Sequence, residues 1–114
     1  MAELEIFEYN GKGYERMVNY GEWTVALANF TDIWRRGNTE YIERHLLTDE
    51  VFVLLSGEGS LLIGEQMSEV RMEKGKVYNV KAGVWHQLIV SEDAKILIVE
   101  NSNTSSENSE KKYI

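Results

Sequence analysis

The chain has 114 residues, of which 43% are hydrophobic and 27% charged, a composition typical of one globular domain. Its net charge of -7 would repel a phosphate backbone, so we expect no nucleic-acid partner. Cysteine is absent, which excludes disulfides, thiolate metal sites and a thiol nucleophile. The first residues lack the basic and apolar regions of a signal peptide, and no apolar run reaches the roughly 18 residues of a membrane helix. We therefore expect a cytoplasmic protein without a membrane partner.

Short runs rich in Val, Ile, Leu, Tyr and Trp follow one another along the chain, separated mainly by glycines. The expected strands cover residues 4–9, 22–30, 40–47, 50–55, 60–63, 66–72, 76–80, 86–90 and 94–100. No segment keeps a helical period over three turns, although residues 31–38 could form one short helical turn. Turn signals recur about every 8–12 residues, which is typical of a β-sandwich or β-barrel. The pattern predicts an all-β fold.

The composition changes after Glu100, where Ser, Asn and Thr replace the apolar residues. Only Tyr113 and Ile114 are apolar in the last 14 residues. A segment of this kind buries too little surface to offset its ordering entropy. We expect one domain over residues 1–100 and a disordered polar tail over residues 101–114.

The sequence contains two histidines. His45 lies near two glutamates in the sequence, and His86 follows a glycine turn. Strand alternation places Glu43 and His45 on one face, and a tight hairpin at residues 47–48 would bring Glu50 opposite His45. His86 follows the glycine turn at Gly83 and begins a new strand. Imidazole nitrogens combined with carboxylate oxygens suit a divalent metal such as Mn, Fe, Ni or Zn.

Each of these residues also has an ordinary structural explanation. His45 and Glu50 could form a simple cross-strand charge pair, and His86 could be a core histidine that donates to a backbone carbonyl. Trp23, Tyr41 and Trp85 are expected to pack in the core or at its rim, and Arg44 to point away from His45.

The stretch around His86 resembles the second conserved motif of the cupin superfamily. Gly75, Gly83 and His86 have the spacing of that motif, which ends with an asparagine after three further residues. Lys81 stands where the family has proline, and Val90 stands where it has asparagine.

The stretch from Glu43 to Gly57 resembles the first cupin motif. His45, Glu50 and Gly57 have the spacing of its second histidine, its glutamate and its glycine, and Glu43 takes the place of its first histidine. The two motifs together cover residues 43–90, and the strand pattern extends the resemblance over most of residues 20–100.

The resemblance implies an antiparallel jelly-roll β-barrel with a site in its mouth. It implies that His45, Glu50 and His86 are metal ligands, with Glu43 as a substitute fourth ligand or as a carboxylate that moves a proton. It leaves open two functions: a metal-dependent oxygenase, isomerase or lyase acting on a small polar metabolite, and a non-catalytic sensor or store for a small ligand. Because small cupins commonly share edge strands, we also expect a homodimer formed through residues 4–9.

Overall fold

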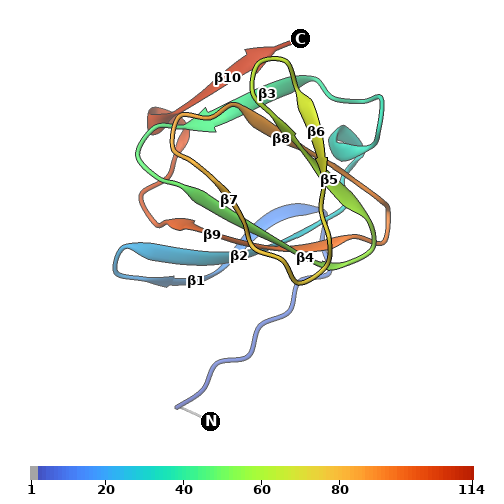
Figure 1. The fold of residues 1–114 in the computed structure, drawn as a ribbon. Helices are drawn as coiled ribbons and strands as arrows, with labels where there is room; N and C mark the ends of the chain where they lie inside the picture. Colours follow the sequence, from blue (N-terminus) through green and yellow to red (C-terminus); the bar gives the residue numbers. More distant parts are fainter. Residues whose placement is uncertain (1–2) are drawn as a thin grey trace.

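In a computed structural model, residues 3–114 form a barrel of two antiparallel five-stranded sheets, as Figure 1 shows. The strands are β1 (Gly13–Tyr20), β2 (Trp23–Asn29), β3 (Tyr41–His45), β4 (Glu50–Ser56), β5 (Gly59–Ile63), β6 (Ser68–Arg71), β7 (Tyr78–Val80), β8 (His86–Val90), β9 (Lys95–Asn101) and β10 (Ser109–Tyr113). Two short 3-10 helices, η1 (Asp32–Trp34) and η2 (Ser106–Asn108), complete the fold. The expected all-β jelly roll and the short helical turn within residues 31–38 are confirmed.

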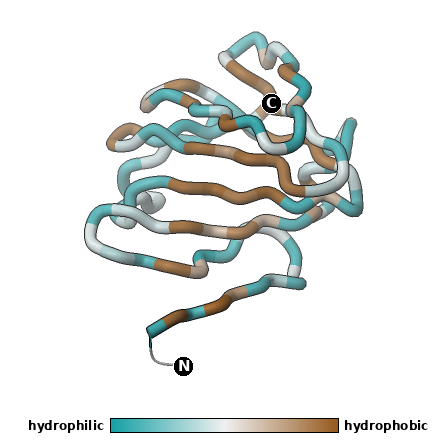
Figure 2. The backbone as a smooth tube through the Cα atoms, turned by 60° about the horizontal axis from the view of Figure 1, so that its bottom comes forward, coloured by the Kyte–Doolittle hydropathy of each residue, from teal (hydrophilic) through white to brown (hydrophobic). Residues whose placement is uncertain are grey.

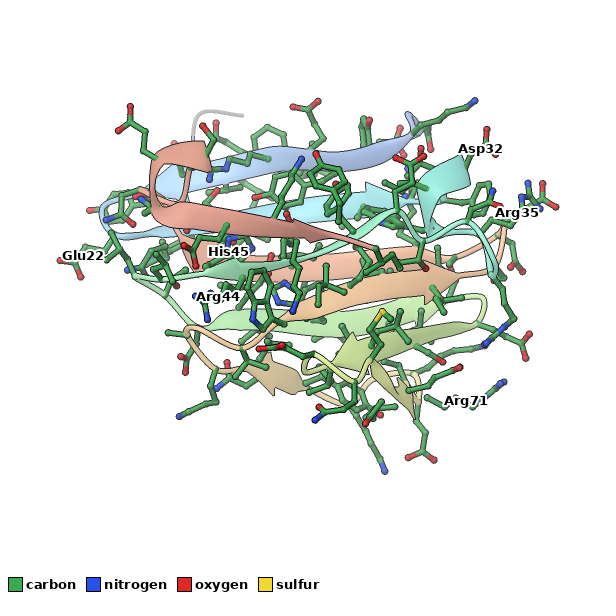
Figure 3. The ribbon with its side chains drawn as sticks, turned by 90° about the horizontal axis from the view of Figure 1, so that it is seen from above. Glu22, Asp32, Arg35, Arg44, His45 and Arg71 are labelled. Carbon is green, nitrogen blue, oxygen red and sulfur yellow. The ribbon has the colours of Figure 1, made fainter. Side chains whose placement is uncertain are left out.

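The strands of the two sheets interleave along the chain. The first sheet has the order β1-β2-β9-β4-β7, and the second has the order β10-β3-β8-β5-β6. Alternate side chains of both sheets point into the barrel, and the apolar ones among them form one core. Its buried members include Ala26, Phe52, Leu54, Leu61, Leu88, Ile96 and Ile98. Charged side chains such as Glu22, Arg35 and Arg71 project outward from the periphery (Figure 3).

Two of the glycines singled out in the sequence are required by the backbone. Gly57 has a φ of 74°, and a Cβ there would lie 2.6 Å from the Cα of Ala94. Gly83 has a φ of 82°, in the turn that leads into β8. Both values lie in the left-handed region that side chains disfavour. The spacing of these glycines is therefore set by the turns of the barrel.

The beginning of the chain differs from the expectation. Residues 4–9, expected to be a strand, pair with no strand of the described residues 3–114 and lead away from the barrel (Figure 1). The first strand is instead β1, which was not expected because it is an edge strand with few apolar residues. It pairs with β2 through a tight turn at Gly21, whose φ is 56°.

The end of the chain corrects the expected domain boundary. Residues 101–114 were expected to be a disordered tail, but β9 runs to Asn101 and residues 109–113 form β10, which pairs with β3 over its full length. The physical reason is that β3 offers an unpaired edge, so polar residues gain order from backbone hydrogen bonds without contributing apolar area. None of the helices in the described part of the chain is long and apolar enough to span a membrane.

Candidate functional site

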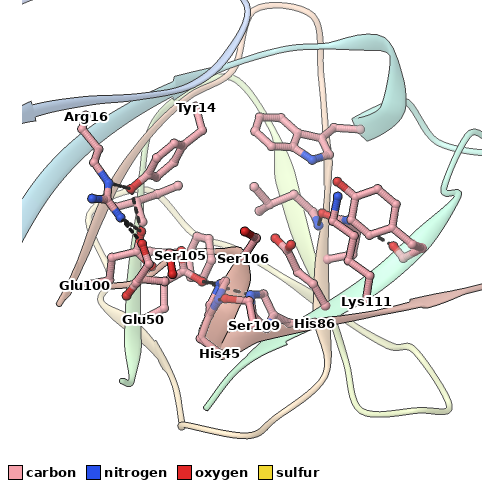
Figure 4. Close-up of a pocket in the computed structure, with 18 residues that line it drawn as sticks. Tyr14, Arg16, His45, Glu50, His86, Glu100, Ser105, Ser106, Ser109 and Lys111 are labelled. Carbon is pink, nitrogen blue, oxygen red and sulfur yellow. Dashed lines mark hydrogen bonds and ion pairs between the residues drawn. The ribbon is translucent and has the colours of Figure 1, made fainter. Parts of the chain in front are cut away.

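Three of the four expected site residues meet through their ligand atoms inside the barrel. The Nε2 atom of His45 lies 3.1 Å from Oε1 of Glu50, and the Nε2 atom of His86 lies 3.0 Å from the same oxygen. His45 comes from the end of β3, Glu50 from the start of β4 and His86 from the start of β8. All three side chains are at most 11% exposed. Figure 4 shows them together at one end of a cavity.

The route by which His45 reaches Glu50 differs from the expectation. The two residues were expected to oppose each other across a hairpin, but β3 and β4 belong to different sheets and do not pair. Residues 46–49 cross from one sheet to the other, so the contact spans the barrel interior. Thr48 is buried in this crossing, and its hydroxyl accepts a hydrogen bond from the backbone of Asn101.

The hydrogen bonds of His86 determine how its ring is presented. Its Nδ1 lies 3.0 Å from the carbonyl oxygen of Val84, which requires an N–H at Nδ1. In the neutral ring Nε2 then has a free lone pair, aimed at a carboxylate oxygen that is also electron-rich. Such a contact is favourable only if Nε2 carries a proton or if one cation binds both atoms.

The charges of the three groups favour a positive partner for Glu50. Burial would raise the pKa of Glu50, but hydrogen bonds from His45 and His86 outweigh it and lower that pKa to about 2. Burial opposes protonation of both imidazoles, yet the hydrogen bond and charge of Glu50 raise their pKa values above that of a free histidine. Without a metal, the ionised Glu50 carboxylate therefore favours the protonated form of both histidines.

The fourth expected residue, Glu43, lies on the same wall as the histidines. Its Cα is paired with that of His86 between β3 and β8, and it contributes to a group in which ligand atoms of Glu43, His45 and His86 lie within 4.8 Å of one another. A second such group joins His45 and Glu50 to Glu100. Two imidazoles with flanking carboxylates form a donor set that suits a borderline divalent metal. The residues present thus fit the metal that the first motif implies.

Neighbouring residues hold the cluster in position. The hydroxyl of Ser109, on β10, lies 2.7 Å from Nδ1 of His45. Asp49 accepts a hydrogen bond from the backbone of Ala82 at 2.8 Å, and the backbone of Gly83 donates to the carbonyl of His45. These bonds tie the turn before His86 to the strands that carry His45 and Glu50.

The sequence reasoning missed three residues on the opposite wall of the cavity. The hydroxyl of Tyr14 donates to Oε1 of Glu100 at 2.6 Å, and Arg16 lies 3.9 Å from the same oxygen. Oε2 of Glu100 is buried and has no hydrogen-bond partner. Burial, reinforced by the nearby charge of Glu50, raises the pKa of Glu100 to about 7. Alternation along β9 could have revealed Glu100, because it continues the inward positions of Ile96 and Ile98.

The cavity has a volume of about 590 Å³, within the range of roughly 300–1,000 Å³ typical of small-molecule sites. Tyr41 lines it, whereas Trp23 is exposed beside Tyr20 and Trp85 packs under the guanidinium of Arg44. The apolar part of its wall is formed by Trp34, Tyr41, Phe52, Leu88 and Ile98. Its polar residues come from β1, β3, β4, β8, β9 and β10, and from the segment between β9 and β10.

Comparisons with known proteins agree with this fold. The cupin domain family matches residues 33–100. A cupin-2 domain protein from Shewanella frigidimarina is similar in structure, with a TM-score of 0.63 and 20% identity over 82% of this chain and 84% of that one. Pac13, described as a nucleoside dehydratase, aligns with a TM-score of 0.66 and 11% identity over 96% of this chain and 93% of its own. KdgF from a Halomonas species aligns with a TM-score of 0.64 and 12% identity over 82% and 80% of the two chains. No significant match was found among curated protein sequences.

Proposed function

This chain belongs to the cupin domain family, and we propose that it binds a divalent metal and acts on a small polar metabolite. The observation that carries the proposal is the convergence of two imidazole nitrogens on one carboxylate oxygen, at 3.0 and 3.1 Å. The proposed ligands are His45, His86 and Glu50, with Glu43 as the fourth, and the metal is Mn, Fe, Ni or Zn.

The residues around the proposed metal favour proton-transfer chemistry of the isomerase or lyase type. A bound metal would supply a Lewis acid that polarises an oxygen of the substrate. Glu43 lies beside the histidines, and where it does not bind the metal its carboxylate is the proposed base that accepts a proton from the substrate. Glu100 is buried close to the cluster, and burial favours the protonated form of its carboxyl group, which can donate a proton to the substrate. A dehydration, the activity named for Pac13, needs such a pair of groups.

Elemental analysis of the purified protein, without chelator or added metal, tests the proposal. We expect stoichiometric metal in the unmodified chain and a steep loss in His45→Ala and in His86→Ala, since each leaves one imidazole. Glu43→Gln should lose less, because the amide oxygen can still bind. The exposed Glu92→Gln is the matched control and should keep full metal. Full metal in the double histidine variant, with the fold intact by circular dichroism, would show that the site is wrong.

A second function, a non-catalytic sensor or store of a small ligand, is favoured by one feature of the cluster. Glu50 accepts hydrogen bonds from both histidines, so the buried groups satisfy one another without a metal. Protein that contains no metal after purification in metal-replete medium, yet binds small ligands in the cavity, would favour this function.

We also propose that two copies associate through the outer face of the first sheet. The outward side chains of its central strands form two apolar rows in register, Val25–Val99–Val51 and Leu27–Leu97–Val53. Figure 2 shows the apolar band running across these strands. Residues 4–9 leave the barrel at the end of this face, where Asn29 and Lys95 donate hydrogen bonds to the carbonyl of Tyr9. Ile6 is 86% exposed in this arm, so the chain supplies both an apolar face and an apolar segment that could cover it in a partner.

A further inference from the structure

Strand β10 adds a row of side chains to the wall of the cavity. Its register with β3 places three residues opposite the inward positions of that strand: Ser109 opposite His45, Lys111 opposite Glu43 and Tyr113 opposite Tyr41. Ser109 and Lys111 both line the cavity. The row therefore runs from the histidine cluster toward the aromatic end.

Lys111 differs from the other basic residues of this region because no carboxylate neutralises it. Arg44 pairs with Glu110, and Lys112 donates to Glu65 at 2.8 Å. Within residues 3–114, the Nζ atom of Lys111 has no carboxylate oxygen within 4.0 Å, although Glu43 is its cross-strand neighbour. It lies 4.3 Å from the centre of the Tyr41 ring instead. A cation over an aromatic face, at the edge of a cavity, keeps its donors free for an anion.

The apolar part of the cavity wall contains flat aromatic side chains. Trp34, from η1, and Tyr41, from β3, line the cavity with Leu88 and Ile98, and Tyr41 lies directly against Lys111. Trp34 is partly buried against the core, which restrains its ring. Such a wall favours a ring-sized, apolar ligand body over an extended polar chain.

We infer that the cavity binds a small ligand with a planar ring and one acidic group, a carboxylate or a phosphate, and that Lys111 binds this acidic group. The ring lies against Trp34 and Tyr41, and the substituent on its other side faces Glu43 and the histidines. The placement of this substituent rests on the proposed function, whereas anion binding by Lys111 does not. The protein as a whole carries a charge of -7, so an anion needs a local cation such as this one.

Titration calorimetry with three simple probes tests the inference: benzoate, its neutral analogue benzamide, and acetate, which lacks the ring. We expect benzoate to bind at millimolar concentrations or better, and acetate and benzamide to bind more weakly. Lys111→Gln should weaken benzoate binding at least about tenfold, because a charge-assisted hydrogen bond is lost. Lys112→Gln, one residue along the same strand, should have no effect. Phenyl phosphate in place of benzoate identifies which acidic group is preferred.

Two further arms separate this inference from the proposed metal site. In chelator-treated protein and in His86→Ala, benzoate binding should persist, so a failure of the metal proposal leaves this result unchanged. Benzoate that binds only when metal is present, or equally to Lys111→Gln and the unmodified chain, would overturn the inference. So would the absence of benzoate binding to the unmodified protein. Thermal melts of both lysine variants check that β10 remains paired.

Discussion

Replacing Glu100 by glutamine should stabilise the metal-free protein at neutral and alkaline pH. The carboxylate lies beside Glu50, and its Oε2 atom is buried without a partner. Burial and the charge of Glu50 raise its pKa from 4.5 to about 7. For an acid, a raised folded-state pKa means that the folded chain holds the proton more tightly than the unfolded chain does. The contribution is thus favourable below pH 4.5 and is lost as the pH rises to 7.

The size of the effect follows from the same values. A pKa shift of this size corresponds to roughly 3 kcal/mol of unfolding free energy, and the attraction of Arg16, 3.9 Å away, reduces it to about 2 kcal/mol. The amide introduced by Glu100→Gln would still accept from Tyr14 and could donate to Glu50. We expect thermal melts in chelator at pH 8 to show a melting temperature higher by several degrees in this variant, with the difference vanishing near pH 4. A difference that is absent at pH 8, or the same at both pH values, would refute the reasoning.

Three further predictions concern Ser109, the C-terminal strand and the N-terminal arm. Ser109→Ala should lower metal affinity by about tenfold, measured by competition with a chelator, because His45 loses the partner that orients its ring; unchanged affinity would show that Ser109 does not position His45. Truncation after Ser102 should lower the melting temperature by more than about 5 °C, because β3 loses the whole of β10; a smaller change would mean that this strand contributes little. Deleting residues 1–9 should shift the species seen by light scattering from dimer toward monomer, and an unmodified chain that is monomeric at micromolar concentration would contradict the proposed interface.

Much of the fold was predictable because the apolar residues of the central strands follow a regular pattern along the sequence. Strands β2, β4 and β9 alternate buried and half-buried residues over most of their length. The two strands that escaped prediction, β1 and β10, are sheet edges, where one side of the ladder is unpaired and few apolar residues are needed. Residues 4–9 show the opposite error: their apolar pattern predicted a strand, but Leu4, Ile6 and Phe7 remain exposed and the segment pairs with no strand of the described chain.

The site was predictable only where spacing along the chain carries information. The motifs located His45, Glu50 and His86, and the structure brings them together, although through a crossing between sheets that no spacing could reveal. Glu100 and Tyr14 meet across 86 residues of sequence on strands that have no shared motif. Such contacts depend on sheet order, which local pattern does not determine.

The order β1-β2-β9-β4 also has a consequence for how this chain folds. Strand β2 ends at Asn29, whereas its neighbour β9 begins at Lys95. The β1–β2 hairpin therefore cannot join the rest of the first sheet until some 65 further residues have been synthesised. Closing so long a loop precedes the contacts that compensate for it, and proteins dominated by such pairings fold in roughly milliseconds to seconds. During synthesis the apolar strands of the first sheet stay unpaired on one edge throughout this interval. The nascent chain is therefore open to chaperones and to aggregation until β9 has emerged.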